Sequence, residues 1–334
     1  MRDARKDCPR IAADTARIRS EVARIYGKSK NVAHGKECNT DLRVAAHLIL
    51  GPREEPFLGA LCESLKDACD VLLVNDNSPD PSPHAATLAQ STFGKTGRLI
   101  VDRTPFTDFA SARNVCVRLH REHDAGDWVV AVDGDDVHTP DVANITRNLH
   151  AVPEHIDYVD GYIRHFFQSF DWYMSVDRHR SFFRFKPELQ WERSVHEQLA
   201  GLSGKRLALP YVYAHYGWVV PAQLHADKLR QYMRLGAPDE THESALERVR
   251  PNSYVAFEKR WATAIRFTGA HPAAAQPTIE QIRRRRGPEF EQVDALVRES
   301  QSLPMRVRNA AMRWNFELRW RGRAINPLAR RILG

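Results

Sequence analysis

The stretch at residues 127–138 constrains the fold of this chain more than any other. Five consecutive apolar residues, 128–132, indicate a strand buried on both faces. Three carboxylates follow where that strand would end: Asp133, Asp135 and Asp136. Carboxylates this close repel one another unless a cation lies between them, so the stretch predicts a site for a hard divalent ion such as Mg²⁺ or Mn²⁺. The alternative is an acidic turn that caps a helix beginning near Thr139.

Length and composition allow a well-packed globular protein. The chain has 334 residues, 43% of them hydrophobic, which suffices for one large domain with appendages or for two modest domains. The five cysteines show neither a paired metal spacing nor the density of a disulfide framework. No signal peptide and no apolar run of about 18 residues is visible, so we expect a cytoplasmic protein without a transmembrane segment.

The positive charge is concentrated near the C-terminal end. The formal net charge is +7, and residues 304–334 alone contain eight arginines against one acid, Glu317. Attraction to nucleic acid, anionic lipid or an acidic partner would therefore come mainly from this arginine-rich tail. Met312, Phe316 and Trp320 recur at helical spacing within it. This pattern fits a peripheral contact with a membrane or polyanion, or docking on the protein's own body.

Strands and helices alternate through the first half of the chain. Strands are predicted at 43–50, 71–74, 98–101 and 128–132, and a helix at about 109–122. This alternation predicts an α/β fold with an open, mostly parallel sheet, whose ligands gather at the carboxyl ends of the strands. Acceptor-rich loops at 51–55, 75–80 and 133–136 fall at such ends. This favours a ligand-binding role for the acidic residues 133–136 over the alternative of a helix cap. His120 is expected on a solvated helix face.

The second half of the chain has a different pattern. Short aromatic strands at 157–185 predict an antiparallel extension, and beyond residue 222 we expect helices only, interrupted among other places at Gly287 and Pro288. The expected organisation is an amphipathic helical appendage at 1–40, a central domain at 41–235, and a helical region at 236–334 with the arginine-rich tail.

Five blocks at the predicted strand ends carry a family resemblance. They are REEPFLGALCESL (53–65), VNDNSPD (74–80), DFASARN (108–114), WVVAVDGDD (128–136) and WERSVHEQL (191–199). In this order they resemble the family 2 glycosyltransferases, inverting enzymes of the GT-A fold, over about residues 43–235. The resemblance implies a Rossmann-like, mostly parallel sheet with a small antiparallel extension.

The resemblance also implies how a nucleotide-sugar donor, a UDP-sugar, is held. Glu54 and Asp76 would contact the uridine. Two positions depart from the family pattern: Arg53 and Asn75. The choice of uracil over another base is therefore open. Arg113 and Asn114 would face the diphosphate and the sugar, with a surface salt bridge from Arg113 to Asp108 as the alternative.

Asp133 and Asp135 resemble the metal-binding Asp-x-Asp pair of the family. Through Mn²⁺ or Mg²⁺ they would grip the donor diphosphate, because a bound cation stabilises the charge that builds up as the diphosphate departs. His215 is the candidate third ligand, since a histidine often reaches the metal from this part of the fold. The alternative is a histidine satisfied within the core.

Direct inversion needs one base to take the proton from the acceptor hydroxyl. Glu197 is the leading candidate and His196 the second, because both belong to the Val-His-Glu block at the expected start of a helix. Asp136 is the third candidate. The alternative is that Glu197 only caps the helix or pairs with Arg193.

The resulting hypothesis is a metal-dependent glycosyltransferase of the hexosyltransferase type that acts on an acceptor hydroxyl. A protein acceptor is favoured, and nucleic acid, glycan or lipid are alternatives. The competing class is a non-catalytic binding module that uses the arginine-rich tail. Nucleotidyl transfer has no glycine-rich phosphate loop to support it.

Overall fold

The computed structural model describes residues 42–194, 196–221, 224, 227, 258–323 and 332, and the helix expected at 1–40 lies outside them. In chain order the strands and α-helices are β1 (Val44–Leu50), α2 (Leu58–Leu65), β2 (Val71–Asp76), α3 (Ala85–Gln90), α4 (Thr92–Lys95), β3 (Leu99–Asp102), α5 (Phe109–Glu122), β4 (Trp128–Asp133), β5 (Asp136–Val137), α6 (Asp141–Asn148), β6 (Ile156–Phe167), β7 (Trp172–Arg184), β8 (Gln190–Glu192), β9 (Gln198–Ala200), β10 (Lys205–Trp218), α9 (Glu258–Thr263), β11 (Ile265–Arg266), α10 (Gln276–Ser300) and α11 (Leu303–Arg323). The domain boundaries at residues 40 and 235 stay predictions.

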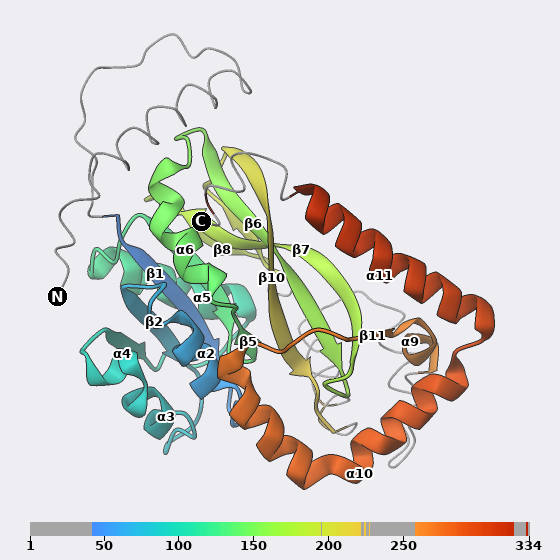
Figure 1. The fold of residues 1–334 in the computed structure, drawn as a ribbon. Coiled ribbons are helices and arrows are strands. Elements are labelled where there is room, and N and C mark those ends of the chain that lie inside the picture. The colour runs from blue at the N-terminus through green and yellow to red at the C-terminus, as the bar shows by residue number, and fades with distance from the viewer. Residues whose placement is uncertain are drawn as a thin grey trace, which may run out of the picture.

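The described strands form one large mixed sheet and a separate hairpin. The large sheet has the order β3-β2-β1-β4-β7-β6-β10-β5, with β11 paired to β7, and β8 pairs with β9. Strands β1 to β4 are parallel, while β7 runs antiparallel to both β4 and β6. Figure 1 shows the parallel half beside the longer strands β6, β7 and β10. The predicted α/β class, a parallel sheet with an antiparallel extension, is confirmed.

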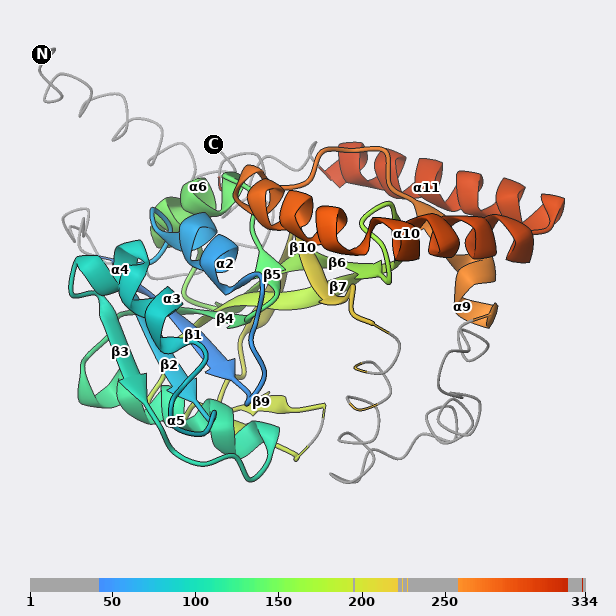
Figure 2. The same ribbon diagram turned by 90° about the horizontal axis from the view of Figure 1, so that it is seen from below.

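Helices cover both faces of the parallel half. Leu61 of α2 and Ile145 of α6 pack into the core on one face, and Leu119 of α5 packs on the other. Figure 2 shows α2 and α6 on one side of the strands and α5 on the opposite side. Because both faces are covered, β1 and β4 are nearly continuous apolar runs rather than alternating ones. Apart from His47 in the middle of β1, the polar side chains of β1, β2 and β4 thus lie at the carboxyl ends of these strands.

The C-terminal helices extend along the antiparallel half. Phe290 of α10 packs with Phe170, and the interruption predicted at Gly287 and Pro288 is confirmed as a kink between two helical segments of α10. Arg286, directly before these two residues, has a non-helical φ of −123°, and Pro288 lacks the N–H that would complete the hydrogen-bond ladder. The expectation of helices only beyond residue 222 is wrong at β11, which pairs with β7.

The side of α11 that faces the body is fixed by a buried polar residue. Asn309 donates through Nδ2 to the Ala264 carbonyl, while Met312 and Trp314 are 47% and 67% exposed. The expected apolar stripe therefore does not dock at Met312, and the side chains of Phe316 and Trp320 lie outside the described ones. Within the ranges that the structure covers, every helix is too short or too polar to cross a bilayer.

Candidate active site

Strand register brings the acceptor-rich loops to one edge of the sheet. Ile49 of β1 pairs with Asn75 of β2 on one side and with Asp133 of β4 on the other. Neighbouring strands lie about 4.8 Å apart, so the loops after β2 and β4 begin roughly 10 Å from each other. The predicted meeting of these loops at the carboxyl ends of the strands is confirmed.

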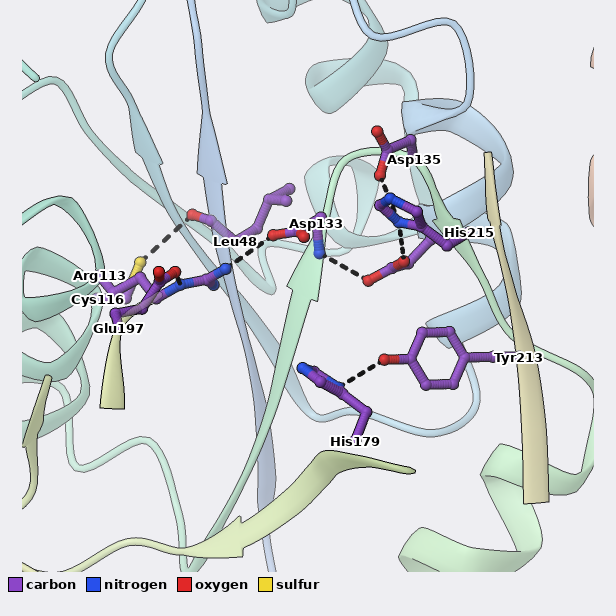
Figure 3. A network of polar contacts seen from close by, with 10 residues as sticks. Leu48, Arg113, Cys116, Asp133, Asp135, His179, Glu197, Tyr213 and His215 are labelled. Carbon is purple, nitrogen blue, oxygen red and sulfur yellow. Dashed lines mark hydrogen bonds and ion pairs between the residues drawn. The ribbon is translucent and has the colours of Figure 1, made fainter. Parts of the chain in front are cut away.

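A tight turn after β4 joins three candidate metal ligands. The Asp133 N–H donates to Asp136 Oδ2 at 2.9 Å, and Asp136 begins β5, which pairs with β10 at His215. This pairing carries His215 to the turn. One ligand atom each from Asp133, Asp135 and His215 lies within 4.8 Å of the others, and Figure 3 shows the group. Carboxylate oxygens with one imidazole suit Mn²⁺, and carboxylates alone suit Mg²⁺.

Two glycines keep space around these ligands. A Cβ on Gly134 would lie 2.9 Å from Glu55 Cγ, so the turn needs glycine to pass the loop after β1. A Cβ on Gly217 would lie 2.3 Å from Asp135 Oδ2 and 2.8 Å from His215 Nε2. The Asp135 carboxylate and His215 Nε2 therefore face one space that Gly217 leaves open. The residues present fit a divalent cation.

Asp136 orients His215 from behind. Its Oδ1 accepts from His215 Nδ1 at 2.9 Å, and its Oδ2 accepts from the Asp133 N–H. Because a carboxylate can only accept, Nδ1 carries a proton and Nε2 is the nitrogen left for a metal. Asp136 was expected as a third candidate base, but both of its oxygens are bonded within the protein. That arrangement suits a positioning residue.

The electrostatics of this pair favour a charged histidine when no metal is bound. Burial raises the pKa of Asp136 to about 6, with the bond from His215 opposing the rise. Burial alone would lower the pKa of His215, but the charges and hydrogen bonds of Asp135 and Asp136 outweigh it and raise this pKa to about 10. A metal must therefore displace a proton from the imidazole.

Arg113, near the start of α5, joins Asp133 to Glu197. Its Nη2 donates to Asp133 Oδ1 at 2.8 Å and its Nε donates to Glu197 Oε1 at 2.6 Å, as Figure 3 shows. The guanidinium lies 5.2 Å from the centroid of the Trp191 ring. Burial would lower the pKa of Arg113, but the two carboxylates raise it above its ordinary value. The alternative pairing with Asp108 is wrong, because Asp108 caps the first turn of α5.

The same helix holds the β8–β9 hairpin in place. Asn114 donates through Nδ2 to the Trp191 carbonyl and accepts at Oδ1 from the Trp191 N–H. The Phe109 N–H donates to the Ser194 carbonyl. Asn114 was expected to face the diphosphate and the sugar. Both of its amide atoms instead engage the backbone of β8, so α5 sets the position of the hairpin.

Glu197 and His196 lie in the turn of this hairpin. The expectation that they begin a helix is wrong, because β8 and β9 are short antiparallel strands. The Glu197 side chain is 15% exposed and pairs with Arg113 rather than with Arg193. His196 is exposed, with a φ of 54°.

The two loops expected to hold the nucleoside differ in burial. Asp76 accepts from a backbone N–H and two serine hydroxyls of the loop that follows it. Burial would raise its pKa, but these hydrogen bonds hold the pKa below its usual value. Asn75 donates to the Ala112 carbonyl, so its amide ties β2 to α5 rather than facing a base. Glu54 is exposed in the loop after β1.

Sequence reasoning missed several neighbours of the ligand group. Gly217 leaves space between Asp135 and His215. The sequence signal that could have revealed this role is its position two residues after His215 on the same predicted strand. His179 bonds the Tyr213 hydroxyl at 2.7 Å, and burial lowers its pKa to about 4 although the charge of Asp133 opposes this. Strand pairing alone reveals that neighbour.

Residues 53–206 match the family model described as glycosyl transferase family 2. The resemblance carried by the sequence blocks is therefore confirmed over this range, and the chain contains a glycosyltransferase domain. The range includes every predicted site residue except His215. The predicted class of enzyme is confirmed with it. No curated protein matches the chain.

Solved structures of two glycosyltransferases are similar at low identity. A mannosyltransferase from Pyrobaculum calidifontis, in complex with GDP-Man and Mn²⁺, is 16% identical, with a TM-score of 0.39, over 95% of this chain and 92% of that chain. Glucosyl-3-phosphoglycerate synthase from Mycobacterium tuberculosis, in complex with Mn²⁺, UDP and phosphoglyceric acid, is 14% identical, with a TM-score of 0.38, over 61% of this chain and 82% of that chain. The Mn²⁺, GDP-Man, UDP and phosphoglyceric acid are ligands of those two proteins.

Proposed function

We propose that the chain is a metal-dependent, inverting glycosyltransferase that moves a sugar from a UDP-sugar to an acceptor hydroxyl. The observation that supports this best is the group Asp133, Asp135 and His215, whose ligand atoms lie within 4.8 Å of one another inside or beside the family 2 domain. A protein hydroxyl is the favoured acceptor. A glycan, lipid or nucleic acid is the alternative.

The three ligands would hold Mn²⁺ or Mg²⁺ through two carboxylates and His215 Nε2. When bound, the cation supplies Lewis-acid stabilisation of the charge on the departing diphosphate. Asp136 keeps the Nδ1 proton of His215 in place and thereby leaves Nε2 free to ligate. Gly217 keeps the ligand space open. Glu54 and Asp76 would lie on the nucleoside side of this group.

Glu197 is the proposed base that takes the acceptor proton. Its carboxylate is fixed by Arg113, which also binds Asp133, so a single guanidinium sets the position of the base relative to the metal ligands. A base must stand within hydrogen-bond reach of the attacking hydroxyl, and such positioning accounts for about 10² to 10⁴ in rate. His196, which is exposed and makes no such contact, is the weaker candidate.

Two variants separate these candidates. In Glu197→Gln we expect kcat to fall by about 10² or more while Mn²⁺ and UDP binding are retained, because only the proton acceptor is lost. In His196→Gln we expect kcat within a few-fold of the unmodified protein. A larger loss of kcat in His196→Gln than in Glu197→Gln would reassign the base.

The donor and the metal are tested together by protection against thermal unfolding. We expect a UDP-sugar to raise the midpoint more than GDP- or TDP-sugars, and only with Mn²⁺ or Mg²⁺ present. Asp135→Asn should abolish the metal-dependent shift and UDP-sugar turnover. The control is Asp171→Asn, whose exposed carboxylate pairs with Arg283 on the other half of the sheet. Turnover that persists in Asp135→Asn would refute the metal assignment.

A further inference from the structure

Three arginines gather around one carboxylate on the antiparallel half of the sheet. Asp160 on β6 has a fully buried side chain and accepts from Arg178 Nε at 2.6 Å and from Arg206 Nε and Nη2 at 3.0 and 2.9 Å. Arg180 stands two residues after Arg178 on β7. Two guanidinium groups thus share the Asp160 carboxylate, and the third arginine makes no hydrogen bond to it. The cluster carries an excess of positive charge.

Arg180 is the member of this cluster that Asp160 does not neutralise. It is half-buried, and no carboxylate of the described residues lies within ion-pair distance of it. Its Nη2 reaches the Glu197 carbonyl at 3.4 Å, which is long for a hydrogen bond. Burial lowers the pKa of Arg180 and the charge of Arg206 lowers it further, although the more distant charges of Asp160 and Glu197 oppose this shift. An anion beside Arg180 would offset both costs.

The cluster adjoins the proposed base. Arg180 approaches the main chain of Glu197, and the side chain of Glu197 leads through Arg113 to Asp133. Figure 3 shows the second part of this path, from Glu197 to Asp133. The arginine cluster therefore borders the hairpin turn that carries the proposed base. An acceptor whose hydroxyl stands beside Glu197 would have its neighbouring groups near this cluster.

The composition of the cluster fits an anionic ligand better than a purely structural role. Two arginines already satisfy Asp160, and the side chains of Arg178 and Arg206 are still 45% and 43% exposed. The guanidinium groups of Arg178 and Arg206 can thus contact solvent while they remain paired with the buried Asp160 carboxylate. A guanidinium fork matches the oxygens of a phosphate or carboxylate in a bidentate manner. The third arginine, Arg180, has no carboxylate partner among the described residues.

We infer that Arg178, Arg180 and Arg206 form a subsite for an anionic group, phosphate or carboxylate, on the acceptor. The inference rests on the proposed function. Binding of the anion holds the acceptor so that its hydroxyl stands beside Glu197. The anion itself takes no part in bond making or breaking.

The test uses the full chain without metal and with inorganic phosphate or acetate as probes. Calorimetric titration at constant ionic strength compares the unmodified protein with Arg180→Gln and Arg180→Lys. Arg180 is chosen because its replacement orphans no buried carboxylate. The control is Arg118→Gln, because Arg118 is 45% exposed and pairs with Asp102 and Glu122, away from the cluster.

We expect Arg180→Gln to weaken binding of the preferred probe by about tenfold or more, since a charge-assisted contact is lost. The probe affinity of Arg180→Lys should lie between those of Arg180→Gln and the unmodified protein. That of Arg118→Gln should stay within twofold of the unmodified protein. The probe that binds more tightly identifies the group as phosphate or carboxylate. Equal affinity in Arg180→Gln and the unmodified protein, or no binding of either probe, overturns the inference.

A second titration keeps this test separate from the proposed function. Mn²⁺ with UDP is added to the unmodified protein and to Arg180→Gln, and we expect the same affinity in both. Loss of UDP binding only in Arg180→Gln would assign the cluster to the donor and overturn the inference. Absence of UDP binding in the unmodified protein would refute the proposed function, whatever the phosphate titration gives.

Discussion

Asp136→Asn tests the arrangement that presents His215 to a metal. The native carboxylate is 3% exposed and accepts two hydrogen bonds, from His215 Nδ1 and from the Asp133 N–H, both at 2.9 Å. An asparagine has one acceptor oxygen and one donor nitrogen. One of the two native donors must therefore meet an amide N–H, or His215 must adopt the tautomer that carries its proton on Nε2.

Either outcome weakens metal binding. A donor facing a donor pushes Asp133 or His215 out of place, and the other tautomer puts a proton on the ligating nitrogen. Replacing such a supporting partner typically costs 10- to 100-fold in metal affinity, which is about 1.4 to 2.7 kcal/mol. The free energy of unfolding should fall as well, by about 1 to 3 kcal/mol, because a buried donor loses its partner.

The assay is calorimetric titration of Mn²⁺ into folded protein, with thermal unfolding measured on the same samples. Asp157→Asn is the matched control, because Asp157 also has a fully buried side chain and accepts from Lys186 and the Gly204 N–H, apart from the proposed ligands. It should lose stability but keep its Mn²⁺ affinity. A Mn²⁺ affinity in Asp136→Asn within twofold of the unmodified protein would refute the reasoning.

Three further predictions follow from the same geometry and from the buried histidines. Gly217→Ala should weaken Mn²⁺ binding by about tenfold or more, because its Cβ would lie 2.3 Å from Asp135 Oδ2; an unchanged affinity in titration would contradict this. Since the pKa of His215 is raised to about 10, Mn²⁺ binding at pH 8 should release about one proton, and the Mn²⁺ affinity should rise with pH. Equal binding enthalpies in buffers of different ionisation enthalpy would argue against this proton release. Burial lowers the pKa of His120 from 6.5 to about 4, so its contribution to the free energy of unfolding is present above pH 6.5 and is lost as pH falls toward 4. Urea unfolding across that range should show a flatter pH dependence in His120→Gln, and parallel curves would count against the assignment.

Much of the parallel half could be predicted from the sequence because its signals are local. The α5 helix begins and ends where its pattern predicted, since Asp108 supplies the cap and the apolar residues recur at helical spacing. The apolar run of β4 located the turn that carries Asp133 and Asp135. Residues this close in the chain need no tertiary information to be neighbours, so local sequence sufficed to propose this pair as metal ligands.

Residues far apart in the chain were harder to assign. Local sequence put His120 on a solvated face, yet it is 1% exposed and bonds His47 at 2.9 Å. It also offered Asp108 as an alternative partner of Arg113, whereas the fold supplies Asp133 and Glu197. Both His120 and Arg113 bond side chains that lie outside their own helix, α5.

The sequence by itself therefore determined the class of fold, the edge of the sheet where a ligand would bind, and the acidic turn at its centre. Tertiary structure decided that His215 reaches this turn, that Asp136 supports it, and that Arg113 links it to Glu197. The physical reason is strand pairing. The antiparallel register of β5 and β10 sets which distant side chains face the turn, and no local propensity encodes that register.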